Sequence, residues 1–175
     1  TATVATNLVI TNGLIISGGT LAKVTFTLNM TSLTMSGGDL TSTSGAVAIT
    51  GNVNISSAAS AINAGTETWT ISGSWTSVSA DDVNWDFLSA TVLFNSATDQ
   101  TMTFAGGTLS TEFGVVTFSS TAGVPVTFTM ALREIRFRGL MTISDAGSTT
   151  ALTTSGLALS GSGTGAALTV GAGGI

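Results

Sequence analysis

The sequence predicts an all-β protein, with a β-solenoid as the expected architecture and a β-sandwich as the alternative. Apolar and polar residues alternate along most of the chain, which is typical of half-buried strands. Pairs such as Gly-Gly, Asn-Gly and Ser-Gly punctuate these stretches, and glycine readily forms turns. The phrase LIISGGTL, residues 14–21, returns nineteen positions later as LTMSGGDL, residues 33–40. A repeat of about 20 to 30 residues suits one solenoid coil, so we expect stacked coils of about 19–25 residues.

Stacking the two copies of this phrase predicts an apolar column through the interior and a glycine corner beside it. After residue 56 the period becomes less regular, so insertions or a sandwich-like section are alternatives for that part. The expected stacked pairs are Leu14 on Leu33, Ile16 on Met35 and Leu21 on Leu40, with Gly18-Gly19 over Gly37-Gly38.

Strand patterns follow one another along the chain. Residues 1–10, TATVATNLVI, alternate without charge and are expected to form a donor or edge strand. The next alternating stretches are 24–30, with Val24, Phe26, Leu28 and Met30 on one face, then 68–75, 91–94, 101–104 and 124–130. We expect one all-β domain over 1–175, with Gly-, Thr- and Ser-rich terminal coils over 144–175.

Charge is unusually scarce. Charged residues make up 7% of the chain, against about 25% in a typical soluble domain, and Thr, Ser, Gly and Asn replace them. Such a surface favours contact with other molecules or a cover of sugar. The net charge of −5 leaves too few Lys and Arg side chains for nucleic acid, so no nucleic-acid partner is expected. No apolar run reaches the roughly 18 residues of a membrane span, and we predict no spanning segment.

The residue inventory argues against an enzyme. The chain has no Cys and no His, so a Ser or Cys nucleophile would lack its usual base and zinc its usual ligands. Carboxylate pairs can hydrolyse glycosides, which leaves a polysaccharide-active β-helix as a minor alternative. We predict no enzymatic activity, no catalytic residue and no cofactor.

The stretch 68–109 carries a family resemblance. It resembles the secreted bacterial and archaeal surface β-solenoid repeats of adhesin and filament type, whose pattern is W-x-[IV]-x-G-x-W followed by T-V-x-F-N. The resemblance implies an extracellular structural role at the cell surface and no defined activity. The insert DDVNWDFL is more acidic and aromatic than the usual one. The matching residues are Trp69, Ile71, Gly73, Trp75, Thr91, Val92, Phe94, Asn95, Gln100, Thr101 and Met102.

A weak calcium candidate lies in that insert. Asp82, Asn84 and Asp86 alternate like the first ligands of a calcium loop, D-x-[DN]-x-[DN]. The glycine and the bidentate acid that should follow are both missing. The alternative is a solvated acidic turn with Trp85 folded back over the coil edge.

A basic segment, LREIRFRG, holds three of the four basic residues. One interpretation is an edge strand whose charges discourage indiscriminate pairing. A second is a contact between copies, in which this strand meets the acidic loop of a neighbour and complementary charge sets the orientation. The residues assigned to that contact are Asp81, Asp82 and Asp86 on one copy and Arg133, Arg136 and Arg138 on the other.

Both ends of the chain look suited to pairing with another copy. Val4, Leu8 and Ile10 alternate in the first ten residues, and the Gly-rich C-terminal segment remains apolar to Ile175. A solenoid end without a polar cap exposes backbone and core, and a head-to-tail contact between such ends builds a fibre. The alternative is a segment of a larger protein whose other parts form the caps.

We therefore predict a structural subunit of an extracellular filament, a homopolymer assembled through β-edges. The alternative is a surface adhesin or stalk segment that binds a glycan or a protein, with Trp69, Trp75 and Trp85 either forming an aromatic platform or packing in the core. Ice binding by outward Thr-x-Thr ranks is a minor alternative. The sequons at Asn29 and Asn54 are the glycosylation candidates and suit an extracellular chain.

Overall fold

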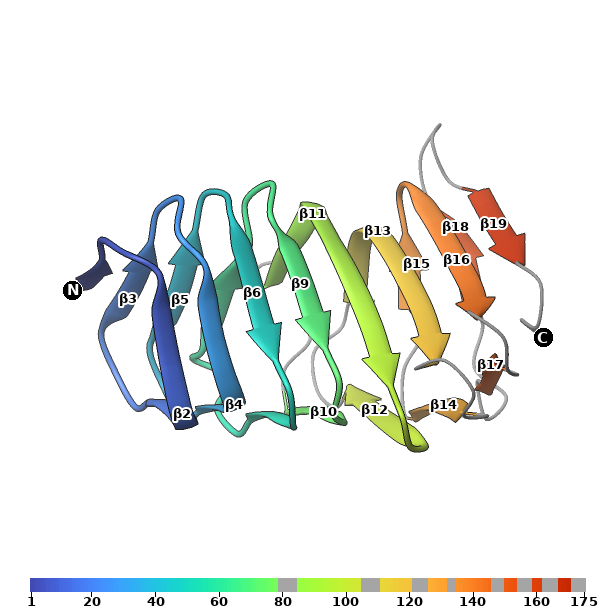
Figure 1. Cartoon of the computed structure of the whole chain (residues 1–175), viewed down its shortest axis with the longest axis horizontal. Coiled ribbons are helices and arrows are strands. Elements are labelled where there is room, and N and C mark those ends of the chain that lie inside the picture. The colour runs from blue at the N-terminus through green and yellow to red at the C-terminus, as the bar shows by residue number, and fades with distance from the viewer. Residues whose placement is uncertain are drawn as a thin grey trace.

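The computed structural model describes residues 1–78, 85–104, 111–120, 126–131, 135–145, 150–153, 159–161 and 167–170. These residues form a β-solenoid (Figure 1). Their paired strands are parallel, as stacked coils of one direction require, whereas a sandwich built from hairpins would be antiparallel. The described part of the chain contains no helix, and hence none long and apolar enough to cross a membrane.

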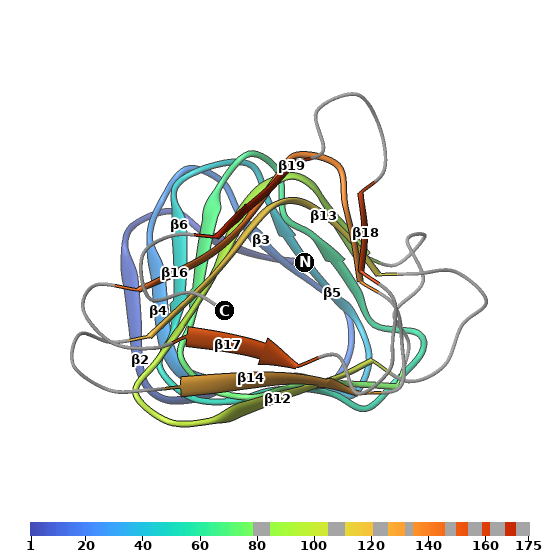
Figure 2. The same ribbon diagram turned by 90° about the vertical axis from the view of Figure 1, so that its right-hand side faces the viewer.

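The strands stack into three ladders, which we call faces A, B and C, and which form the sides of a roughly triangular cross-section (Figure 2). Face A begins with the first half of β2 and ends with β19. Its members are β2 (Leu8–Ile16), β4 (Leu28–Met35), β6 (Ala46–Ile49), β9 (Thr68–Ile71), β11 (Trp85–Ser96), β13 (Thr111–Ser120), β16 (Leu140–Asp145) and β19 (Ala167–Val170).

The other two faces follow the same rule. Face B starts with the second halves of β2 and β4 and continues through β7 (Val53–Ile55), β10 (Trp75–Ser77), β12 (Gln100–Phe104), β14 (Val126–Ala131) and β17 (Thr150–Thr153). Face C is formed by β1 (Ala2–Val4), β3 (Thr20–Lys23), β5 (Asp39–Ser42), β8 (Ala61–Asn63), the starts of β11 and β13, β15 (Ile135–Phe137) and β18 (Leu159–Gly161).

The two copies of the repeated phrase, residues 14–21 and 33–40, stack on each other in successive coils, as the sequence predicts. The three expected apolar pairs are in register: Leu14 with Leu33, Ile16 with Met35 and Leu21 with Leu40. The glycine corner also stacks. Gly38 has a positive φ of 79°, and a Cβ there would lie 2.5 Å from the carbonyl oxygen of Gly19. Glycine is therefore required at this corner by both conformation and space.

The coils lengthen along the solenoid. On face B, Leu33 pairs with Val53 twenty positions later, Val53 with Trp75 at 22, Trp75 with Met102 at 27, and Met102 with Met130 at 28. These last two steps exceed the predicted 25 residues, whereas the step from Val126 to Thr150 on face B is 24 and the successive steps on face A, from Trp69 to Val92, Val116 and Met141, are 23, 24 and 25. Strands keep their register because the additional residues lie between strands, and the described ladders continue past residue 56 without a sandwich-like section.

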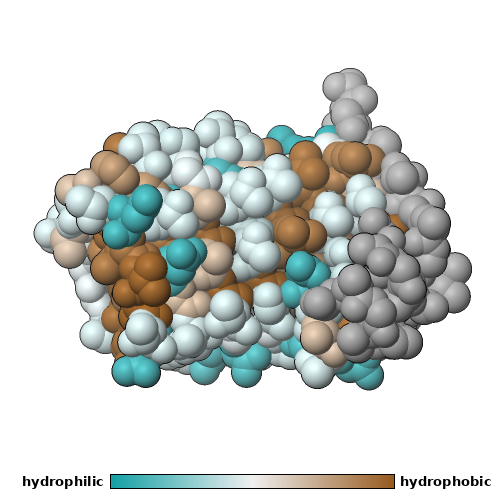
Figure 3. Space-filling view, in the orientation of Figure 1, coloured by the Kyte–Doolittle hydropathy of each residue, from teal (hydrophilic) through white to brown (hydrophobic). Residues whose placement is uncertain are grey.

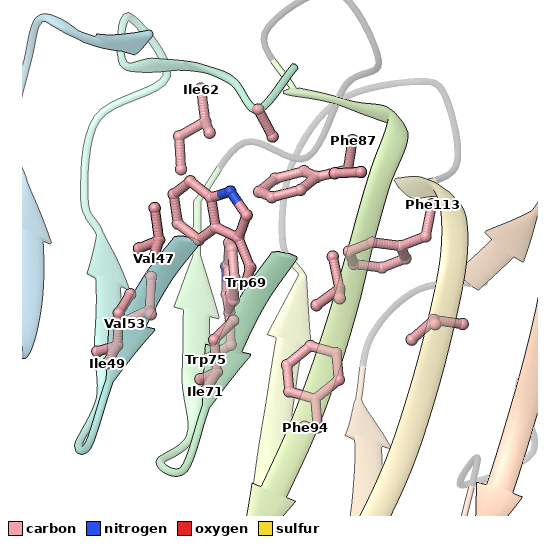
Figure 4. Packing of buried hydrophobic residues seen from close by; sticks show 14 of the residues in the cluster. Val47, Ile49, Val53, Ile62, Trp69, Ile71, Trp75, Phe87, Phe94 and Phe113 are labelled. Atoms are coloured by element: carbon pink, nitrogen blue, oxygen red, sulfur yellow. The ribbon is translucent and has the colours of Figure 1, made fainter. Parts of the chain in front are cut away.

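The core changes character with coil length. The first coils enclose Leu, Ile, Val and Met side chains, whereas the middle coils enclose aromatic rings (Figure 4). Trp69 packs edge-on against Phe87 with ring centroids 5.2 Å apart, and Phe94 stacks on Phe118 at 5.2 Å. A longer coil encloses more space, and large rings fill it at the close packing that protein interiors require.

One predicted strand begins later than expected. In the stretch 24–30 the strand starts at Leu28, and residues 24–27 form the bend that leads from face C to face A. Val24 is 43% exposed there, although its alternation with Leu28 predicted a shared inner face. Alternation continues through a corner, but a corner residue has no fixed inner side.

Candidate functional site

The strongest candidate for a functional site is the free edge of the first coil, formed by β1 and β2. Strand β2 pairs with β4 along one side, and no described strand pairs with its other side. The amide of Leu8 donates to the carbonyl of Thr27 at 2.9 Å, and the carbonyl of Ile16 accepts from the amide of Ser36 at 3.0 Å. Since backbone groups of successive strand residues point to opposite edges, those of Val9 and Ile15 point away from β4. This edge is a template for another strand.

Apolar side chains are exposed along the same edge. Val9 is 66% exposed and Ile15 71%. A hydrophobic area is visible at the end of the molecule where β2 lies (Figure 3). Leu14 is half-buried, whereas Leu33, one coil later, is fully buried. The apolar column of the interior is therefore open at this end.

A hollow of about 230 Å³ lies beside this opening, between β1 and the corner that joins β2 to β3. Its lining residues are Ala2, Leu14, Ile15, Ile16, Ser17, Gly18, Thr20 and Leu21.

The last described strands of the solenoid lie on the same three faces. Strand β19 is the last described strand on face A, β17 on face B and β18 on face C, and each pairs on one side within the described residues. At the first coil, β2 supplies the edges of faces A and B, and β1 supplies that of face C. The first and the last described strands thus lie on the same three faces and run in the same direction, but face B ends with β17, one strand earlier than faces A and C.

The residues predicted for assembly near the N-terminus lie on these first strands. Val4 is on β1, where it pairs with Lys23 of β3 and its side chain is buried. Leu8 is exposed and Ile10 half-buried, both on β2. Leu8 and Ile10 therefore belong to the free edge by position.

The predicted charge contact is only partly described. Asp81, Asp82, Arg133 and Ile175 lie outside the described residues. Asp86 is exposed, and its Oδ1 accepts the amide of Leu88 at 3.2 Å.

The interpretation of the basic segment as an edge strand is wrong. Arg136 lies in β15 and Arg138 is exposed just after it. Strand β15 pairs with β13 on one side and β18 on the other, because the solenoid continues beyond it. Alternation alone does not indicate whether a strand has one neighbour or two.

The calcium candidate stays a weak prediction. Asp82 and Asn84 lie outside the described residues, and Asp86 is the member of the set that the structure places. Within the described part of the chain, no three Asp, Glu, His or Cys residues are grouped in a way that would hold a metal ion.

The three tryptophans belong to the core. Trp69 and Trp75 are fully buried and Trp85 is 1% exposed. Trp85 does not fold over the coil edge, because β11 pairs with β8 in a register that sets it beside Ile62, and its ring lies 4.9 Å from that of Trp75. These rings form no exposed platform for a sugar.

Outward positions carry the sequons and the threonines. Asn29 is half-buried on face A and Asn54 exposed on face B, and both alternate with buried neighbours. Glycosylation at these sites stays a prediction. The register pairs Thr101 with Thr129 and Thr76 with Thr103, so loops of unequal length still bring some threonines into line. Asn54 pairs with Thr76 and interrupts that rank, and ice binding likewise remains a prediction.

A second feature, which the sequence reasoning missed, is a buried polar cluster in the early coils. Lys23 Nζ lies 2.5 Å from Glu67 Oε2, and both side chains are fully buried. Nζ also donates to the carbonyl of Ser44 at 2.5 Å. Trp69 Nε1 donates to Glu67 Oε1 at 2.5 Å, and Ser42 Oγ donates to the same oxygen. We call these five residues the buried cluster.

One sequence signal could have indicated it. In the strand TLAK, Lys23 has the same parity as Leu21, whose column faces inward, so alternation alone puts the lysine inside. Residues 1–78 contain three charged side chains, Lys23, Asp39 and Glu67. The cluster buries Lys23 and Glu67, which leaves Asp39 as the charged side chain outside it. The outer surface of the first coils is therefore almost uncharged.

No protein-family model, no curated protein and no solved structure matches this chain. The likeness of residues 68–109 to secreted surface repeats rests on the sequence motif.

Proposed function

We propose that the protein is the structural subunit of an extracellular filament that polymerises head to tail through its strand edges. The observation that carries the proposal is the match between the two ends. Strand β1 and the first half of β2 of one copy would continue the ladders of faces C and A that end in β18 and β19 of the next, whereas on face B one further strand would lie between β17 and the second half of β2. A contact between two different surfaces of this kind does not close on itself, and repetition builds a fibre.

The contact satisfies groups that the free edge leaves open. Backbone groups of Val9 and Ile15 would gain partners, each hydrogen bond contributing about 0.5–1.5 kcal/mol net. The half-buried side chains of Leu14 and Leu21 would be covered from above, as Leu33 and Leu40 are covered within the molecule. Backbone pairing supplies direction, and apolar burial supplies most of the free energy.

The nearly uncharged surface supports the same proposal. Subunits that carry many like charges repel one another on close approach, whereas the first coils have one charged side chain outside the buried cluster, Asp39. The extracellular location is supported by the sequence resemblance and by the outward positions of Asn29 and Asn54.

The test is electron microscopy of the purified chain over a concentration series, with two variants at one residue. Ile15→Pro removes a backbone donor from the free edge of β2, where proline is tolerated because no described strand uses that donor. Ile15→Thr is the matched control, because it keeps the donor and the strand propensity. We expect uniform filaments from the wild type and from Ile15→Thr, and monomers from Ile15→Pro.

Two outcomes would contradict the proposal. Wild-type monomers at every concentration would rule out self-assembly and favour the adhesin segment, which would then be screened against glycans and surface proteins. Filaments of unchanged length and number from Ile15→Pro would show that β2 is not the assembly edge.

A further inference from the structure

The buried cluster connects three successive coils near the first coil. Lys23 lies at the end of β3, Ser42 pairs with it from β5, and Glu67 precedes β9. An amine and a carboxylate thus touch inside the core at 2.5 Å, forty-four residues apart in sequence. A buried ion pair is held at a large cost in desolvation, which makes this arrangement unusual in a chain so poor in charge.

The hydrogen bonds of the cluster are distributed unequally. An ammonium group has three protons to donate, but Nζ of Lys23 has two acceptors among the described residues, Glu67 Oε2 and the Ser44 carbonyl. On the carboxylate, Oε1 accepts from two donors, Ser42 and Trp69. The other oxygen, Oε2, is bonded to the lysine alone in the described part of the chain.

We propose that Lys23 and Glu67 are the site of an intramolecular amide cross-link. In the reaction a bond forms between Nζ and the Glu67 side-chain carbonyl carbon, and the bond from that carbon to Oε2 breaks. Two protons of the ammonium group pass to Oε2, which leaves as water. The third proton stays on the amide nitrogen. Positive and negative charges cancel, and no oxidant, reductant or further reactant is consumed.

The product would satisfy every polar atom of the cluster. The amide N–H donates to the Ser44 carbonyl, which already accepts from Nζ. The amide carbonyl keeps Oε1, whose two lone pairs already accept from Ser42 and Trp69. The oxygen that leaves is the one whose only described partner is the lysine. A neutral, fully bonded amide thereby replaces two buried charges.

The same residues favour the reaction. Burial holds the amine and the carboxyl in contact, which replaces a bimolecular encounter with an intramolecular one. Negative charge develops on Oε1 as the nitrogen attacks, and the two fixed donors on that oxygen stabilise it. The buried environment also favours loss of water over the reverse hydrolysis.

The cross-link is tested on the full-length wild-type chain by mass spectrometry and trypsin. Lys23 is the only lysine in the sequence, and an acylated lysine is not cleaved. We expect the folded and then denatured protein to be lighter than its sequence by one water molecule. Trypsin should fail to release residues 1–23 and should instead release residues 1–133, and fragmentation of that peptide should give no backbone fragments from the loop that the cross-link closes between Lys23 and Glu67.

Two variants complete the test. Glu67→Leu removes the carboxyl, so its mass should equal the sequence mass and trypsin should release residues 1–23, whether or not this variant folds. Ser42→Ala keeps both reacting groups and removes one donor to Oε1, so the water loss should develop more slowly in freshly folded protein. A wild-type mass equal to the sequence mass, in protein shown by circular dichroism to be folded, would overturn the proposal. Neither result depends on filament formation.

Discussion

At the scale of single residues, glycine and lysine show how the stacking of coils determines the surroundings of a residue. Gly18 and Gly38 come from two copies of the same phrase, yet their surroundings differ. A Cβ at Gly38 would meet the backbone of the coil before it, whereas one at Gly18 would meet nothing within 4 Å. Lys23 resembles a surface residue by type, but the coil places it inside beside Glu67.

This difference gives a prediction for the corner. Gly38→Ala should lower the free energy of unfolding by about 1–3 kcal/mol, because Gly38 has a positive φ and its Cβ would clash with Gly19. Gly18→Ala is the control and should change stability by less than about 0.5 kcal/mol. Urea titration followed by circular dichroism measures both. Equal losses in the two variants would show that corner stacking does not require glycine.

At the scale of elements, the position of a strand within its ladder determines what the strand tolerates. Strand β10 pairs with β7 on one side and β12 on the other, so its backbone groups have partners in both directions. Strand β2 pairs with β4 alone among the described strands. The two strands therefore differ in their tolerance of proline.

We expect Thr76→Pro in β10 to destabilise the protein by about 3 kcal/mol or more, since proline breaks an interior ladder. Ile15→Pro in β2 should leave the melting temperature of the monomer nearly unchanged. Thermal unfolding at a concentration below assembly compares the two. If Ile15→Pro proved as damaging as Thr76→Pro, the backbone donor of Ile15 would already be in use within the molecule.

At the scale of the whole molecule, the first and the last described strands of the solenoid lie on the same faces, and charged residues are scarce in the sequence. Its longest dimension is the direction in which coils are added (Figure 1). The proposed growth at the ends would therefore continue the fold instead of adding a separate interface. Charge would contribute little to the proposed contact. Of the three charged side chains in residues 1–78, two lie in the buried cluster, which leaves Asp39.

The proposed assembly should consequently be insensitive to salt. Raising the ionic strength from about 0.01 M to 1 M shortens the screening length from about 30 Å to 3 Å, which weakens ionic contacts but not backbone pairing or apolar burial. We expect light scattering to report similar polymer mass at both extremes. Strong loss of polymer at high salt would instead favour the contact between the acidic loop and the Arg136–Arg138 strand, which Arg136→Glu with Arg138→Glu would then test.

The sequence by itself determined the class of the fold. Alternation identified the strands, and the repeated phrase identified both the solenoid and the pairs Leu14–Leu33 and Leu21–Leu40. These features are local or strictly periodic, so the residues encode them directly. The free edge over residues 1–10 was predicted in part for the same reason, since an uncharged alternating segment is a strand wherever it lies.

The tertiary structure alone decided which residues are covered and by what. It put Trp85 in the core beside Trp75, gave β15 two neighbours, and brought Glu67 to Lys23 across forty-four residues. Alternation gives the side of a strand on which a residue lies, but burial depends on the coils above and below. Where the number of residues per coil varies, as it does after Val53, the residue that stacks on a given position cannot be found by counting along the sequence. Only the folded chain determines which residues stack.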